Sequence, residues 1–130
     1  MEEGSKKNRG RVLAIGFAHL VHDTPGAFLA PILPLLIDKF GLSVFLAGLL
    51  EQFRRLPSLA NPFLGLMADR ICIRWFIILM PGVTAVSMSL LGIAPGYAFL
   101  SILLLISGIS SAIFHVTCPV MMKHVSSRRI

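Results

Sequence analysis

The stretch YAFLSILLLISGISSAIFHVTCPVMM, residues Tyr97 to Met122, decides the fold class of this chain. It contains no Asp, Glu, Lys or Arg, and it is longer than the roughly 20 residues that a helix needs to cross the hydrocarbon core of a bilayer. Three further apolar runs precede it, Val12–Ile37, Ser43–Ala68 and Trp75–Ile93. Because lipid offers no partner to unpaired backbone groups, we expect all four runs to be transmembrane helices.

The composition agrees with a membrane environment. The chain has 130 residues, of which 55% are hydrophobic and only 14% are charged. An ordinary soluble domain has about 25% charged residues. We therefore predict an all-α integral membrane protein with a four-helix region over residues 12–122, flanked by tails at 1–11 and 123–130.

The links between the runs indicate the orientation in the membrane. Residues 38–42, 69–74 and 94–96 are short links, so consecutive helices are expected to be antiparallel neighbours. Most basic residues fall before the first run, in the second link and after the fourth run, namely Lys6, Lys7, Arg9, Arg11, Arg70, Arg74, Lys123, Arg128 and Arg129. Since Lys and Arg stay on the cytoplasmic face, we expect both tails and the second link to be cytoplasmic and the protein to lie in the plasma membrane.

Several other classes of protein are not expected. The net charge of +6 lies at membrane edges rather than on one face of a soluble fold, which argues against a nucleic-acid partner. The first run continues to Ile37 and three more follow it, which favours a retained helix over a signal peptide. The sequence shows no nucleophile with a base, no phosphate-binding glycine loop and no metal-ligand spacing, so neither enzyme activity nor a cofactor nor a metal is expected. Cys72 and Cys118 are expected to be free thiols on the reducing side.

Ionisable side chains nevertheless lie within three of the predicted spans. Residues three and four positions apart share a face of a helix. Such faces hold His19, His22 and Asp23 in the first span, Glu51, Arg54 and Arg55 in the second, and His115 in the fourth. Because a charge inside the bilayer is costly, these side chains are expected to face a water-filled path or a partner. The third span has only hydroxyl groups and is expected to be a support that faces lipid.

Small residues and prolines modify the spans. Gly108 and Ala112 on the fourth span are predicted to allow close helix packing. The four prolines Pro31, Pro34, Pro57 and Pro62 are predicted to kink the first and second spans.

Depth along the helices suggests which ionisable groups meet. At about 1.5 Å of rise per residue, Asp23 reaches the level of Arg54 and Arg55 near the midplane, and His19 reaches the level of His115 nearer the cytoplasm. In one alternative, an arginine pairs with Asp23, which is then structural, and the histidines carry the coupling proton.

In the other alternative, Glu51 neutralises both arginines within its own helix, since the spacings of three and four residues permit ion pairs. Asp23 is then free to carry a coupling proton. Histidine is the side chain that titrates nearest to cellular pH, so His19 and His115 are predicted to relay protons from the inner side, unless they are satisfied structural donors.

The second link carries a family resemblance. GLMADRICIRW, residues 65–75, resembles the loop between helices two and three of the major facilitator superfamily. The matching residues are Gly65, Asp69, Arg70 and Arg74, whereas Cys72 replaces a second glycine. HLVHD in the first span and SSAIFH in the fourth resemble stretches of the fosmidomycin-resistance type of that superfamily, although Val116 stands where proline is usual.

The resemblance implies a twelve-helix secondary transporter, of which this chain is expected to be the amino-terminal third. It implies that helices one and four line the central path, that helix three lies outside, and that Asp69 with Arg70 and Arg74 closes the inner side. The expected partners are the lipid bilayer, a small organic substrate, protons, and either the remaining helices or a second copy. The expected function is proton-coupled efflux.

Two alternatives to this function stay open. In the first alternative, the chain is a self-sufficient four-helix multidrug exporter that acts as a dimer. In the second, it is a non-transporting membrane remnant. A reading frame that continues after Ile130 would support a fragment, and a stop codon there would support one of the alternatives.

The predicted topology has a direct test. Reporter fusions after residues 40, 72, 95 and 130 should report outside, inside, outside and inside, because each position follows one further crossing. Alkaline phosphatase and green fluorescent protein, which are active on opposite sides of the membrane, provide the measurement. Any other order would contradict four crossings.

Overall fold

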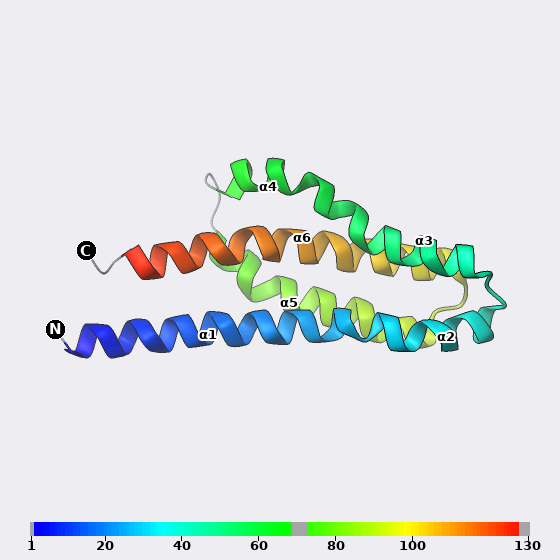
Figure 1. Cartoon of the computed structure of the whole chain (residues 1–130), viewed down its shortest axis with the longest axis horizontal. Coiled ribbons are helices and arrows are strands. Elements are labelled where there is room, and N and C mark those ends of the chain that lie inside the picture. The colour runs from blue at the N-terminus through cyan, green and yellow to red at the C-terminus, as the bar shows by residue number, and fades with distance from the viewer. Residues whose placement is uncertain (1, 69–72, 128–130) are drawn as a thin grey trace.

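The computed structural model describes residues 2–68 and 73–127, and within them it contains helices and turns but no strand (Figure 1). The elements in order are α1 (Glu2–Ala27), α2 (Leu29–Phe40), α3 (Val44–Arg55), η1 (Leu56–Ala60), α4 (Asn61–Ala68), α5 (Ile73–Ser89), η2 (Leu90–Ile93) and α6 (Tyr97–Ser127), where η denotes a 3-10 helix. The predicted all-α class is therefore confirmed. The start of α1 and the end of α6 lie at the same end of the bundle (Figure 1).

Within the described residues, three stretches are helical, long and apolar enough to cross a membrane. They are Arg9–Phe40, Arg74–Ile93 and Tyr97–Lys123. They correspond to the first, third and fourth predicted spans. The composition and length of these helices support a membrane protein.

The second predicted span, Ser43–Ala68, is not a single straight helix. It is divided into α3, η1 and α4. The break coincides with Pro57, which has no amide hydrogen and whose ring crowds the preceding turn. The Ser58 hydroxyl donates a hydrogen bond of 2.7 Å to the carbonyl of Arg55 beside the break. The predicted proline kink is thus present, and it is strong enough to divide the span.

The first predicted span is longer than expected and is interrupted at Phe28. Its helix begins at Glu2, well before Val12, and α1 and α2 follow each other almost end to end (Figure 1). Phe28 separates them, and its amide donates to the carbonyl of Pro25 at 3.2 Å. Pro31 cannot donate to the preceding turn, which explains why the regular bonding pattern is interrupted here.

The turn between α2 and α3 is fixed by its own residues. Gly41 ends α2 in the left-handed region with φ 59°, where a side chain would be strained. The Ser43 hydroxyl then accepts a 3.2 Å hydrogen bond from the amide of Leu46 and caps α3. These two residues set the chain reversal between the first and second predicted spans.

The end of the bundle that lies away from the chain termini holds the apolar core. Its buried members are Leu29, Leu36, Leu50, Met88, Leu91, Ala94, Leu100, Leu103 and Leu104, from α2, α3, α5, η2 and α6. The Lys39 ammonium donates to the carbonyl of Gly92 at 2.8 Å, and the Tyr97 hydroxyl donates to the carbonyl of Leu46 at 3.1 Å. These bonds join the two turns at this end and so hold the neighbouring helices together there.

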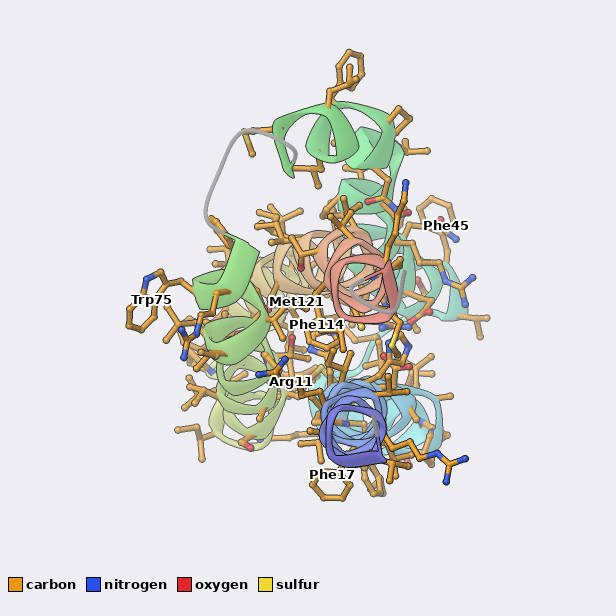
Figure 2. The ribbon with its side chains drawn as sticks, turned by 90° about the vertical axis from the view of Figure 1, so that its left-hand side faces the viewer. Arg11, Phe17, Phe45, Trp75, Phe114 and Met121 are labelled. Carbon is orange, nitrogen blue, oxygen red and sulfur yellow. The ribbon has the colours of Figure 1, made fainter. Side chains whose placement is uncertain are left out.

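Helix α5 packs along α6 through hydroxyl groups as well as apolar side chains. Thr84 donates to the hydroxyl of Ser110 at 2.9 Å, and Ser110 donates to the carbonyl of Met80 at 2.7 Å. The opposite side of α5 exposes apolar groups, including Trp75, which points away from the bundle (Figure 2). One face of α5 therefore suits lipid, as expected, while the other packs into the interior of the helix bundle.

The crossing of α6 with the end of α3 depends on Gly108. A Cβ atom added at this buried glycine would lie 2.9 Å from the carbonyl carbon of Arg54 and 3.1 Å from the ring of Pro57. Real Cβ atoms do not approach a backbone carbonyl so closely, so no other residue fits without moving a helix. The predicted role of Gly108 in close packing is confirmed.

We predict that Gly108→Ala destabilises the fold by about 1–3 kcal/mol, as overpacking of a tight contact typically does. Gly48→Ala is the matched control, because Gly48 is exposed on α3 and an added Cβ there meets nothing within 4 Å. Alanine is the better helix former, so Gly48→Ala should be neutral or stabilising by up to about 1 kcal/mol. Thermal unfolding of the purified protein in detergent measures both, and equal melting temperatures would contradict the tight crossing.

Candidate functional site

The most polar contact of the bundle joins α1 to α6. His19 and Asp23 lie one helical turn apart on α1, and His19 Nε2 is 3.1 Å from Asp23 Oδ2. His115 on α6 places its Nε2 3.4 Å from the other carboxylate oxygen, Oδ1. The two imidazole rings are 5.1 Å apart between centroids. The predicted meeting of His19 and His115 is confirmed, and the structure adds Asp23 to it.

His22 is held in a different way. It is only 1% exposed, and its ring stacks on Phe114 of α6 with centroids 4.0 Å apart. Figure 2 shows Phe114 directed between α6 and α1. Neither ring nitrogen has a hydrogen-bond partner among the described residues. A buried polar group without a partner is costly, so His22 is suited to bond to a molecule that enters beside it.

Such a space exists next to His22. A cavity of about 250 Å³ is lined by His22, Asp23, Gly26, Ala27, Arg54, Thr84, Ser111 and His115. The lining comes from α1, α3, α5 and α6, and most of it is polar. Since one water occupies about 30 Å³ of liquid, the cavity has room for several waters or a small organic molecule.

The cavity corrects the expectation for the third predicted span. Thr84 of α5 is buried and lines the cavity, so this helix is more than a lipid-facing support. A single threonine in an apolar helix gives no sequence signal of this role. Only the packing of α5 against α1 and α6 turns Thr84 inward.

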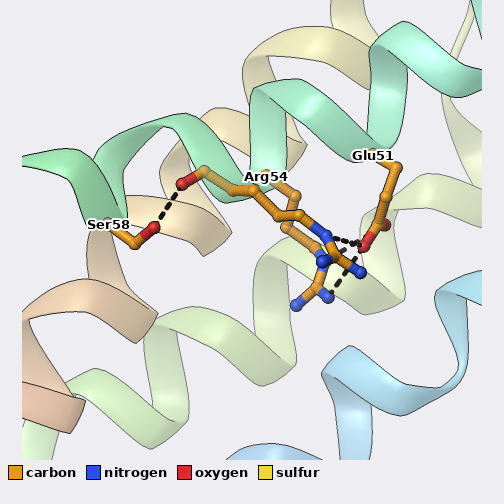
Figure 3. A network of polar contacts seen from close by, with 4 residues as sticks. Glu51, Arg54 and Ser58 are labelled. Atoms are coloured by element: carbon orange, nitrogen blue, oxygen red, sulfur yellow. Dashed lines mark hydrogen bonds and ion pairs between the residues drawn. The ribbon is translucent and has the colours of Figure 1, made fainter.

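Glu51 binds both arginines of α3 (Figure 3). Arg54 Nη2 lies 3.2 Å and Arg55 Nε lies 2.8 Å from Glu51 Oε1. In the described part of the chain, neither arginine forms an ion pair with Asp23. Of the two arrangements that the sequence left open, the structure therefore has the one in which Glu51 neutralises the arginines.

Arg54 still lines the cavity, which it reaches from α3, whereas Asp23 reaches it from α1. A Cβ atom added at Gly26 of α1 would lie 3.1 Å from Arg54 Nη1, so the guanidinium reaches from α3 to α1. Any larger residue at position 26 would press on it. A cationic and an anionic group thus line the same small space.

Gly65 and Arg74, the described residues of the predicted inner gate, do not line the cavity. Gly65 lies on α4 and Arg74 lies exposed near the start of α5. Asp69, Arg70 and Cys72 fall outside the described residues. Cys118 is a buried free thiol, as expected.

We predict that Glu51→Gln lowers stability by about 1–3 kcal/mol, because it leaves two arginines without their shared carboxylate. Arg55→Gln is the control. The Arg55 side chain is 67% exposed, so its ion pair should contribute under about 1 kcal/mol. The additional change Arg54→Gln in the Glu51→Gln variant should recover part of the loss. Thermal unfolding in detergent gives the comparison, and a Glu51→Gln variant as stable as the wild type would refute this ion-pair network.

Comparisons with known proteins do not identify a family for this chain. No protein-family model, no curated protein and no solved structure matches the chain.

Proposed function

We propose that the chain forms the amino-terminal part of a secondary transporter, and that it moves small organic molecules out of the cell in exchange for protons. The observation that carries this proposal is the polar cavity between α1, α3, α5 and α6. Ionisable groups inside apolar helices typically mark the path of a substrate or an ion. In secondary transporters, such sites lie at membrane depth between helices rather than at the surface.

The distribution of side chains around the cavity supports this proposal. Phe17 on α1 and Trp75 on α5 point away from the bundle, where lipid would surround them (Figure 2). His22, Asp23 and Arg54 point to the cavity instead. A helix bundle with a merely structural role has no need of charged groups at this depth, since apolar packing is less costly.

The lining also suits an organic molecule with polar groups. His22 offers two unpartnered ring nitrogens, and Asp23 and Arg54 offer charges of opposite sign. A few directed polar groups in a small cavity are typical of ligand sites. The proposal places the exit of the path on the outer side and the inner gate at residues 65–74, the latter through the family resemblance alone.

We predict that Asp23→Asn lowers transport at least about tenfold, equivalent to about 1.4 kcal/mol, because Asp23 is the acidic group of the cavity. Asp38→Asn is the matched control, since Asp38 is an exposed acid near the end of α2 and away from the cavity. Inverted membrane vesicles that contain the chain, with any further helices that its reading frame encodes, are tested with an imposed proton gradient. Accumulation of a panel of small fluorescent organic compounds is the readout.

Two outcomes would refute the proposal. In the first, no compound of the panel accumulates in a gradient-dependent way, even though the protein is present in the vesicles. In the second, the Asp23→Asn variant transports as fast as the Asp38→Asn variant.

A further inference from the structure

We propose that His19, Asp23 and His115 form a binding site for one divalent transition-metal ion, with Zn²⁺ as the best match. One ring nitrogen of each histidine and a carboxylate oxygen all lie within 4.8 Å of one another. This set of ligands has no recognisable spacing in the sequence, because the third ligand comes from a helix far along the chain. The site is formed only when α6 packs against α1.

The distances between the ligand atoms suit a metal ion. Zn²⁺ binds His nitrogen and carboxylate oxygen at about 2.0–2.2 Å, so neighbouring ligands of a tetrahedral ion are about 3.3–3.5 Å apart. His19 Nε2 lies 3.1 Å from Asp23 Oδ2, and His115 Nε2 lies 3.4 Å from Asp23 Oδ1, so each imidazole faces one oxygen of the carboxylate. One ligand atom from each of the three residues lies within 4.8 Å of the others, so binding requires these side chains to draw closer together.

The chemistry of the three ligands selects the class of ion. Two imidazoles with one carboxylate are a common set for Zn²⁺ and for other first-row divalent ions. Mg²⁺ and Ca²⁺ prefer shells made of oxygen ligands. The carboxylate of Asp23 supplies negative charge, and Arg54, which lines the same cavity, is already paired with Glu51.

The site is also accessible to an ion. The His19 and His115 side chains are each 41% exposed, and that of Asp23 is 46% exposed. Asp23 and His115 line the cavity described above, so a fourth coordination position can open towards it. Three protein ligands with one open position are the arrangement of zinc sites that also bind water or a small molecule.

The neighbouring groups are distinct from the ligands. His22 is buried and stacks on Phe114, and Cys118 is buried one turn after His115 on α6. Neither belongs to the group of atoms that lie within 4.8 Å of one another. Both therefore provide tests of which side chains hold the ion.

The experiment measures metal binding by the purified full chain in detergent after all metal has been removed. Co²⁺ serves as the optical probe, because its visible absorption reports a low-coordinate site. We expect saturable binding of one Co²⁺ per chain, displacement by Zn²⁺, and no displacement by Mg²⁺ at the same concentration. His19→Gln and His115→Gln should each weaken binding at least about tenfold. His124→Gln and Cys118→Ser, which remove a histidine and a thiol outside the three ligands, should leave it within about twofold.

A second measurement uses the unaltered chain and so does not depend on the folding of variants. Zn²⁺ should protect His19 and His115 from modification by diethyl pyrocarbonate, as read by mass spectrometry of peptides, while His124 reacts at an unchanged rate. The proposal is overturned if Co²⁺ binding does not saturate, if His124→Gln or Cys118→Ser abolishes it, or if Zn²⁺ protects neither His19 nor His115. Neither measurement involves transport, so the outcome is independent of the proposed function.

Discussion

A polar side chain in a helix that crosses a bilayer must find its partner within the protein, because lipid offers none. This constraint accounts for the contacts around the cavity. Glu51 takes both arginines of its own helix, which α3 can arrange without help from its neighbours. Asp23 instead requires α6, since its second imidazole contact comes from His115. The ionisable residues therefore divide into a local group on α3 and an interhelical group that exists only in the assembled bundle.

Helix α6 is the element on which this assembly depends. In the 18-residue apolar segment of Tyr97–Lys123, 44% of the residues are buried. The corresponding shares are 17% for Arg9–Phe40 and 22% for Arg74–Ile93. Helix α6 contacts α1, α3, η1, α4 and α5. Gly108 lets the end of α3 approach α6, and this approach carries Arg54 towards Gly26 of α1. A single residue without a side chain thus helps to set where the cationic group of the cavity lies.

The sequence predicted the helices and the polar faces well, but not how those faces combine. Hydropathy alone located the apolar runs, and the count of helical rise brought His19 to the level of His115. The count of helical rise could not decide whether Asp23 meets an arginine or a histidine, because the rotation and tilt of each helix depend on how the helices pack. The inward position of Thr84 has the same origin, because it depends on how α5 lies against α1 and α6, which no local pattern encodes. The division of the second span, in contrast, follows from Pro57 itself, which the sequence shows.

The two ends of the bundle differ in the kind of contact that holds the helices together, and the cavity lies at the more polar end. Near the turns, leucines from α2, α3, η2 and α6 pack together with Met88 of α5, and two hydrogen bonds join the links. Nearer the chain termini, the contacts between α1 and α6 involve histidines, one carboxylate and a cavity. Close-packed apolar groups lose much when they separate, whereas a hydrated cavity can exchange its contents at lower cost. Any opening of the helices should therefore occur at the polar end, with the apolar end as the fixed point, and an ion or substrate held between α1 and α6 would oppose that opening.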